Sequence, residues 1–211
     1  MYNLPEFKDH NPSFYREFID QHPFAFLCGC DMEGKPIATQ LPIRLHESDG
    51  KLFLRGHIMK DTDHHRAFER NPNALLVFTG PHAYVSASWY THPVMGSTWN
   101  YLSVQAHGRI RWMEESELRE LMQELSLHFE RGNTESPTVF NNLPKAYTNA
   151  MVQWISGIEV EVEKMEQVVK LSQNRDAESY RNIQVRLRAQ GGQAAEVAEE
   201  MEKRFQGLFG A

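Results

Sequence analysis

Residues 51–78 read KLFLRGHIMKDTDHHRAFERNPNALLVF, and the fold prediction starts from this stretch. Its first part, Lys51 to Ile58, and its last part, Ala74 to Phe78, are both typical of strands. Between them, Asp61 to Arg70 is polar and predicts a short helix or a loop, which Asn71-Pro72 closes. The stretch therefore predicts two strands that are connected through a basic strand-to-helix junction.

The flanking sequence adds further strands on both sides. Two short turns, Met32–Lys35 and Glu47–Gly50, separate the early strands, so we expect antiparallel hairpins there. Near residue 160, Ile158, Val160 and Val162 alternate with glutamates, which indicates a half-exposed strand with an acidic outer face. The other predicted strands are Phe24–Asp31, Pro36–His46, Pro81–Ser88 and Trp99–Met113.

Apolar residues at helical spacing predict helices around this sheet. The clearest helix runs from Glu114 to Arg131, because Leu118, Leu121 and Leu125 repeat there and acidic residues crowd its first turn. Short antiparallel strands with few helices between them predict a mainly β, α+β fold, a barrel with helices packed outside. The other helices are predicted to begin at Asn11-Pro12 and to span Lys145–Val152, Asp176–Arg188 and Ala194–Phe205.

Length and composition narrow the class of protein. The chain has 211 residues, of which 41% are hydrophobic and 24% charged, as in ordinary globular proteins. Its net charge of −6 argues against a protein whose main work is to hold a nucleic-acid backbone. No segment is typical of a signal peptide or a membrane span, and Cys28 and Cys30 lack the CxxC spacing. We therefore expect a cytoplasmic protein without membrane contact.

Two parts of the sequence are candidates for a binding site. At the strand-to-helix junction, Arg55, His57 and Lys60 precede a helix start, an arrangement that can hold a phosphate, although a solvated basic turn explains it as well. The runs Tyr84–Tyr90 and Ser97–Tyr101 are rich in aromatic residues. Such residues usually fill a core or a dimer interface, and the alternative is a wall for a flat ring system.

The ten histidines do not form a metal-binding motif. His64 and His65 are adjacent, so they point in different directions on a helix, and the others are spread over separate elements. We therefore predict no metal site. A haem ligand cannot be selected among them either.

The order of several motifs resembles the PaiB family, the FMN-binding negative transcriptional regulators. The resemblance covers nearly the whole chain. It rests on residues 1–7, Pro23–Phe26, Thr39–Pro42, Gly56-His57, Phe78–Tyr84, Ser88–Tyr90, Thr98–Tyr101 and Lys170–Arg175. It implies an antiparallel split β-barrel similar to pyridoxine-phosphate oxidases and small flavin reductases, in which two subunits pair and FMN lies at their interface. A homodimer with two equivalent FMN sites is thus implied.

The chemistry of FMN then suggests roles for residues at matching positions. Cationic side chains are candidates for its phosphate, hydroxyl and imidazole groups for the ribityl chain or ring edge, and aromatic groups for closing the site from the partner subunit. The polar cluster after the last strand could complete the phosphate end or cap a terminal helix. The predicted cofactor-binding residues are Thr39, Arg55, His57, Lys60, Arg66, Thr79, Ser86, Ser88, Trp89, Trp99, Asn100, Lys170, Gln173 and Arg175, with Asn174 beside them.

Three functions follow from these observations. The first is an FMN-dependent oxidoreductase of the flavin reductase type, with NADH or NADPH as a candidate electron donor and no residue required as acid or base. The second is a transcriptional regulator that acts directly or indirectly, for which the basic segment Arg175 to Arg188 is the best DNA-contacting candidate. The third is haem binding or degradation. A composition change after Arg175 divides the predicted domains into residues 1–175 and a helical extension, packed on the barrel, over residues 176–211.

Overall fold

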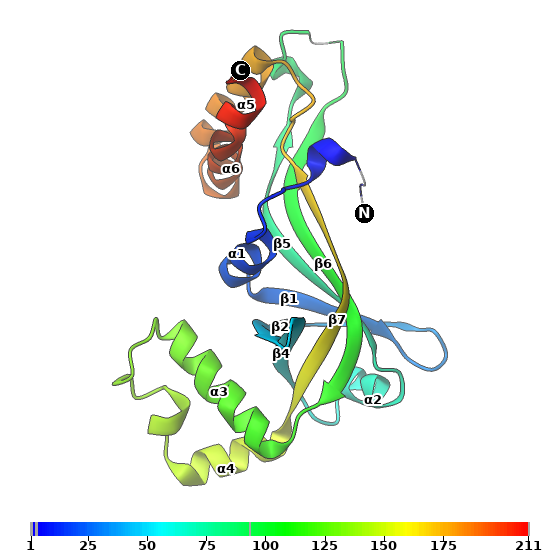
Figure 1. The fold of residues 1–211 in the computed structure, drawn as a ribbon, viewed down its shortest axis with the longest axis vertical. Coiled ribbons are helices and arrows are strands. Elements are labelled where there is room, and N and C mark those ends of the chain that lie inside the picture. The colour runs from blue at the N-terminus through cyan, green and yellow to red at the C-terminus, as the bar shows by residue number, and fades with distance from the viewer. Residues whose placement is uncertain (1, 3, 93, 211) are drawn as a thin grey trace. The chain divides into compact units, whose positions relative to one another are not determined.

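The computed structural model describes residues 2, 4–92 and 94–210. Four residues of the segments discussed above lie outside the described residues: Met1, Asn3, Pro93 and Ala211. The described chain forms seven strands and six α-helices (Figure 1). The strands are β1 Phe24–Cys30, β2 Pro36–Pro42, β3 Arg44–Ser48, β4 Lys51–Met59, β5 Asn73–Val85, β6 Thr98–Trp112 and β7 Ile155–Lys170. The helices are α1 Phe14–Gln21, α2 Asp63–Arg70, α3 Glu115–Phe129, α4 Lys145–Trp154, α5 Ala177–Gln190 and α6 Gly192–Phe209.

The strands form one sheet of order β2-β1-β5-β6-β7-β4-β3. The predicted hairpins are confirmed, since β1 pairs antiparallel with β2 and β3 pairs antiparallel with β4. The mainly β, α+β fold predicted from the sequence is therefore confirmed. Strands β5, β6 and β7 are the longest and lie next to one another in the sheet (Figure 1).

Two strand boundaries differ from the prediction. Pro36 to His46 is not one strand, because the chain changes partner at Pro42, which has no backbone N–H. Strand β2 pairs with β1 at one edge of the sheet, and β3 pairs with β4 at the other. Conversely, Ala74–Phe78 and Pro81–Ser88 are not two strands but belong largely to one strand, β5. Buried and more exposed residues alternate along β5, but Gly80 and Pro81 are both buried, so the alternation shifts by one residue there. A β-bulge, which inserts one extra residue in a strand, has this effect.

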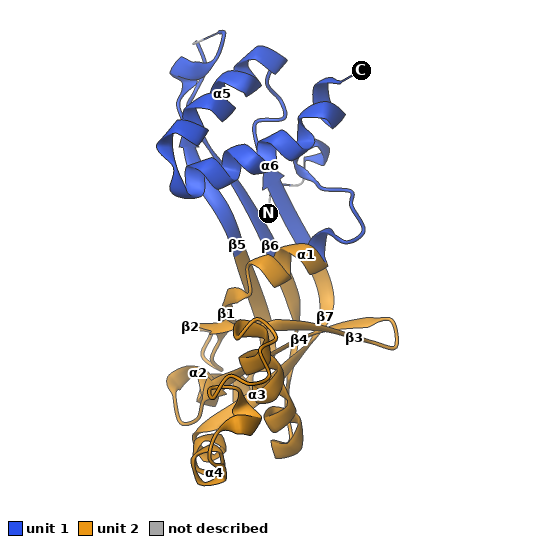
Figure 2. Ribbon diagram, turned by 90° about the vertical axis from the view of Figure 1, so that its left-hand side faces the viewer, with its two compact units in different colours: residues 1–15, 79–104, 166–211 blue, residues 16–78, 105–165 orange. Residues whose placement is uncertain are grey.

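The chain divides into two compact units, which Figure 2 shows in different colours. Unit 1 consists of Met1–Tyr15, Thr79–Val104 and Glu166–Ala211, and unit 2 of Arg16–Phe78 and Gln105–Met165. The three long strands contribute to both units. Each unit is described by itself below.

Unit 2 contains strands β1 to β4 and helices α2, α3 and α4. Helix α3 begins with a capping box, in which the side chains of Glu114 and Glu117 each accept a hydrogen bond from the other residue's backbone N–H. Leu118 of α3 packs in one core cluster with Phe140 and Val152. The polar segment after β4 is a helix, α2, because the Thr62 side chain accepts a hydrogen bond from the His65 backbone N–H.

Unit 1 contains the predicted C-terminal helices, found as α5 and α6. Apolar side chains from both helices are fully buried, and the buried Tyr180 hydroxyl donates a hydrogen bond of 3.0 Å to the Met201 carbonyl. The buried residues of this helical hairpin include Tyr180, Ile183, Leu187, Val197, Ala198 and Met201. The proposed boundary between residues 175 and 176 stays a prediction.

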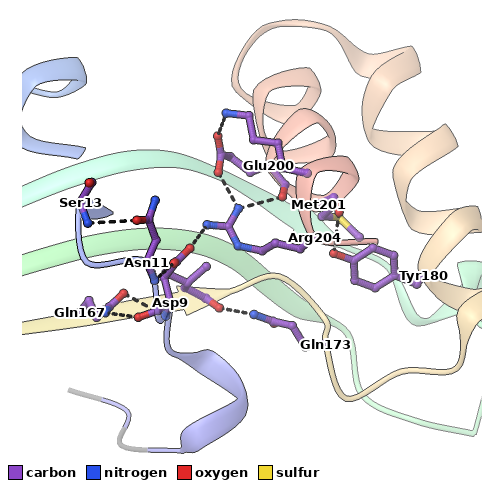
Figure 3. Close-up of polar contacts among 11 residues, drawn as sticks. Asp9, Asn11, Ser13, Gln167, Gln173, Tyr180, Glu200, Met201 and Arg204 are labelled. Carbon is purple, nitrogen blue, oxygen red and sulfur yellow. Dashed lines mark hydrogen bonds and ion pairs between the residues drawn. The ribbon is translucent and has the colours of Figure 1, made fainter. Parts of the chain in front are cut away.

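The N-terminal segment is joined to β7 and α6 by a polar cluster in unit 1 (Figure 3). Gln167 of β7 accepts from the Asp9 N–H at 3.1 Å and donates to the Asp9 carbonyl at 2.8 Å. Arg204 of α6 lies 2.5 Å from the Asp9 carboxylate and 2.7 Å from that of Glu200. The side-chain amide of Gln167 thus forms two hydrogen bonds with the backbone of Asp9. The ion pair between Asp9 and Arg204 links the N-terminal segment to helix α6.

Replacing Asp176 by Asn should lower the stability of unit 1 in a pH-dependent way. Asp176 caps α5, and hydrogen bonds from the Ser179 side chain and backbone lower its pKa from 3.8 to about 2. The folded pKa lies below the unfolded value, so the charged carboxylate stabilises the fold above about pH 4, and this contribution is lost as the pH falls towards 2. We expect thermal melts of the variant and the natural chain to differ at pH 7 and to converge near pH 2.

Among the residues that the structure describes, no helix combines the length and apolarity that crossing a membrane requires.

Candidate functional site

An open groove of about 360 Å³ lies on the β5–β6 part of unit 1. Because the alternation of β5 reverses at Gly80-Pro81, Thr79 and His82 are both exposed. Trp99, Tyr101 and Ser103 follow the two-residue period of β6 and therefore share one face of that strand. The groove is lined by Thr79, Gly80, His82, Trp99, Tyr101, Leu102 and Ser103.

The aromatic residues beside this groove are exposed rather than buried in a core. The Trp99 ring is 53% exposed, and its centroid lies 6.1 Å from the His82 ring and 6.1 Å from the Tyr84 ring. Tyr84 is 48% exposed as well. Of the two interpretations of the aromatic runs, core filling therefore applies to Tyr90, which is buried, whereas Tyr84 and Trp99 form an open wall. Such a wall suits a flat ring.

Several predicted site residues in unit 1 have partners within the unit. The Ser86 hydroxyl lies 2.8 Å from that of Ser88, and Ser86 accepts from the Ser88 N–H at 3.3 Å, which caps the short turn that contains Trp89. Asn100 is 0% exposed, accepts from the Ser172 hydroxyl at 2.9 Å and donates to the Met201 sulfur at 3.7 Å. These contacts give Ser86, Ser88 and Asn100 roles in holding unit 1 together.

The polar cluster after β7 contains Lys170, Gln173 and Arg175. The Gln173 amide accepts from the Leu171 N–H at 2.7 Å and donates to the Val169 carbonyl, so it shapes the turn that follows the strand. Lys170 donates to the Thr98 hydroxyl and, at 2.7 Å, to the Trp99 carbonyl. The ammonium group of Lys170 therefore lies beside the backbone of the residue that forms the groove wall.

In unit 2, Arg55 belongs to a charged network across β4, β7 and β6. Arg55 Nε lies 2.6 Å from Glu159, its partner in the β4–β7 register, and Arg111 Nη2 lies 2.9 Å from the same carboxylate. Arg111 also forms two hydrogen bonds with Glu117, at 2.7 and 2.9 Å, and these hydrogen bonds help to lower the Glu117 pKa to about 2. The acidic outer face predicted for β7 is therefore wrong at Glu159, whose side chain is only 8% exposed and pairs with two arginines.

The other predicted residues of unit 2 lie on β2, at the end of β4 and on α2. Thr39 is half-buried on β2, and the Arg66 side chain is exposed and donates to the Asp61 carbonyl at 2.5 Å. His57 has a buried Nδ1 without a hydrogen-bond partner among the described residues, and burial lowers the pKa of its ring. Within the described chain, the Lys60 ammonium has no hydrogen-bond or ion-pair partner, and its backbone N–H donates to the Trp154 carbonyl.

The structure thus assigns the predicted residues to two separate sets. Thr79 and Trp99 meet in one groove, and Lys170 lies beside Trp99. Sequence reasoning did not select His82 or Tyr101, although the motif Phe78–Tyr84 contained the first and the motif Thr98–Tyr101 contained the second. The set in unit 1 is Thr79, Ser86, Ser88, Trp89, Trp99, Asn100, Lys170, Gln173 and Arg175, and the set in unit 2 is Thr39, Arg55, His57, Lys60 and Arg66.

The basic segment considered for DNA contact is confirmed as helix α5. The Arg181 guanidinium lies 4.3 Å from the Phe205 ring centroid, and Arg188 lies 3.8 Å from the Glu202 carboxylate. Arg186 is exposed. Two arginines of the segment therefore contact the helical hairpin itself, and DNA binding stays a prediction.

The family of the chain follows from comparison with known proteins. A family model described as "Putative FMN-binding domain" matches residues 1–164, and the chain belongs to this family. The chain is also 31% identical over 206 residues to "Protease synthase and sporulation protein PAI 2" of Bacillus subtilis, covering 97% of this chain and 98% of the relative. The resemblance to the PaiB family is thereby confirmed, as is FMN as the cofactor of the family.

Solved structures confirm the antiparallel split β-barrel. The "FAD and Heme binding protein" of Mycobacterium smegmatis matches with a TM-score of 0.58 at 16% identity, over 77% of this chain and 72% of that one. The "putative 5-nitroimidazole antibiotic resistance protein" of Bacteroides thetaiotaomicron matches with a TM-score of 0.53 at 18% identity, over 75% of this chain and 84% of that one. At these identities the likeness shows the fold alone.

Proposed function

We propose that this protein is an FMN-dependent oxidoreductase of the flavin reductase type, with NADH or NADPH as electron donor. The observation that carries the proposal is the open aromatic groove of unit 1. A flat, partly apolar ring needs a wide aromatic face with a few polar groups at its edge. Trp99 and His82 supply the face, and the exposed Thr79 supplies a hydroxyl. When bound there, FMN supplies the electron-transfer chemistry, and the protein positions it.

Unit 2, taken by itself, contains predicted residues that are available to a ligand. Lys60 has no described partner for its ammonium group, so it is available to an anion. The buried, unpartnered Nδ1 of His57 is a polar atom for which a ligand would provide a hydrogen bond. Arg55 is less available, because the buried Glu159 carboxylate already compensates its charge. Within unit 2, Lys60 and His57 are therefore better candidates than Arg55 for contact with a ligand.

We further propose a homodimer, supported by exposed apolar side chains on the sheet. In unit 2, Phe24 is 58% exposed and Phe26 is 39% exposed on one face of β1. In unit 1, Tyr84 and Trp99 are exposed on β5 and β6. Exposed apolar groups of this size on sheet faces are typical of protein–protein contacts, and a second copy of the chain would cover them.

The test of this function combines binding and reduction. The purified protein is mixed with FMN, passed through a desalting column and examined by visible absorbance. The proposal expects retained flavin and anaerobic bleaching of its absorbance near 450 nm by NADH or NADPH, about 450 nm being the usual region of oxidised flavin. Absence of flavin binding in titrations would refute it. Retention without bleaching by either nucleotide would refute the reductase assignment.

Replacing Trp99 by Ala should weaken flavin binding about tenfold, because a lost aromatic stacking partner is worth ~1.5 kcal/mol. The matched control is Trp154→Ala in unit 2, since Trp154 is 69% exposed and does not line the groove. Quenching of FMN fluorescence on titration gives both affinities. Equal affinities of the Trp99 and Trp154 variants would exclude Trp99 from the flavin site.

A further inference from the structure

Lys170 is a half-buried cation whose known partners are all neutral. Its ammonium group donates to the Thr98 hydroxyl and, at 2.7 Å, to the Trp99 carbonyl. An ammonium group has three protons to donate, so one remains for a further acceptor. Burial, and to a smaller extent the charge of the Arg175 guanidinium, lower the pKa of Lys170.

Arg175, in the turn between β7 and α5, is also a half-buried cation whose partners are neutral. Its Nη1 lies 3.1 Å from the Met95 sulfur, and its guanidinium carbon lies 4.7 Å from the centroid of the Tyr90 ring. Neither partner carries a negative charge. Asp176 follows directly in the sequence, but its carboxylate accepts hydrogen bonds from Ser179 and Thr91.

The absence of a carboxylate distinguishes Arg175 from comparable arginines. Among the residues that the structure describes, every other half-buried arginine pairs with Asp or Glu: Arg44, Arg55, Arg119 and Arg204. Removing a charge from water is costly unless an opposite charge accompanies it. Lys170 and Arg175, five positions apart in the chain, both lack a carboxylate partner among the described residues, and this points to an anion supplied by a ligand.

We propose that Lys170, Arg175 and the Thr98 hydroxyl form an anion site for the phosphate monoester of a planar aromatic ligand. The proposal rests on the proposed function for the ring, which would lie against Trp99, the residue whose carbonyl Lys170 contacts. A phosphate dianion matches two cations in charge, and its oxygens accept from an ammonium, a guanidinium and a hydroxyl together. The phosphate belongs either to FMN or to a second ligand of the flavoprotein.

The experiment compares ligands that differ only in the phosphate. FMN and riboflavin are titrated into the full-length protein and into Lys170→Gln, Arg175→Gln and Lys170→Arg, with fluorescence quenching as the readout. Phenyl phosphate is titrated by calorimetry as a probe of the anion site that needs no flavin. Arg186→Gln is the matched control, since Arg186 is exposed on α5 and its replacement removes the same charge. Thermal melts establish that each variant is folded.

If the anion is the phosphate of FMN, the natural chain binds FMN at least tenfold more tightly than riboflavin. Both glutamine variants then reduce this ratio to below about twofold, and Lys170→Arg retains most of it. If the anion belongs to a second ligand, the FMN-to-riboflavin ratio is unchanged, and the glutamine variants lose phenyl phosphate binding at least tenfold. Both results support the site.

The proposal is overturned if the folded glutamine variants match Arg186→Gln in both titrations. Failure of the proposed function is distinguishable from this outcome. A natural chain that binds neither FMN nor riboflavin contradicts the flavoprotein assignment, and the phenyl phosphate titration then decides alone whether the anion site exists.

Discussion

Replacing Glu159 by Ala is expected to destabilise the protein by about 3 kcal/mol, because it leaves two arginines without their shared carboxylate. The Glu159 side chain is only 8% exposed, and it faces Arg55 on one side and Arg111 on the other. Most of the cost comes from Arg55, whose side chain is 25% exposed and would keep no acidic partner among the described residues, because Arg111 is 49% exposed and retains Glu117. Urea unfolding followed by circular dichroism measures the effect.

The matched control is Glu163→Ala on the same strand. Glu163 is exposed and has no partner among the described residues, so its replacement should change the free energy of unfolding by less than about 0.5 kcal/mol. Glu159→Gln should have an intermediate effect, because the amide keeps a hydrogen-bond acceptor but loses the charge. A Glu159→Ala variant as stable as the Glu163→Ala variant would show that the network contributes nothing to folding.

The second large effect is expected from Gly108→Ala in β6. A Cβ atom at this position would lie 2.1 Å from the carbonyl oxygen of Glu161 and 2.8 Å from Val160 Cγ1 on the neighbouring strand β7. The first of these atoms is backbone, so the clash is relieved only by separating the two strands. We expect a loss of about 3 kcal/mol or more, at the upper end of the range for overpacked sites.

Gly96→Ala provides the control for this prediction. Gly96 lies in the loop before β6, and apart from its chain neighbours no atom of the described residues would lie within 4 Å of its added Cβ. The control variant should therefore melt within a few degrees of the natural chain, whereas Gly108→Ala should melt far lower or fail to fold. Equal melting temperatures would show that β6 and β7 adjust their spacing without cost.

Much of the fold could be predicted from local patterns. The alternation of Lys51 to Ile58 gave strand β4, and the apolar repeat of Glu114 to Arg131 gave helix α3 within two residues at each end. The exchange of partners at Pro42 could not be predicted in this way. Leu41 and Ile43 are both buried, so the alternation continues through the point where the chain leaves one edge of the sheet for the other. Periodicity reports burial, but it carries no information about which strand lies alongside.

The same reasoning applies to the candidate site. Of the predicted cofactor-binding residues, two line the groove: Trp99 from the aromatic runs and Thr79 from the motif Phe78–Tyr84. The buried position of Glu159 could not be predicted from the sequence, because alternating glutamates in a strand are typical of a solvated face. Its partners Arg55 and Arg111 are distant in sequence, and only the tertiary structure brings them to it.

The contact between Asp9 and Arg204 has a consequence for how the chain folds. These residues are 195 positions apart, and unit 1 is assembled from three separate stretches of the chain. During synthesis Asp9 therefore leaves the ribosome long before Arg204, and the two residues can pair only after the chain has been extended by those 195 positions. Docking of the N-terminal segment should thus be a late folding event, and its slow formation would set the time at which unit 1 becomes resistant to proteolysis.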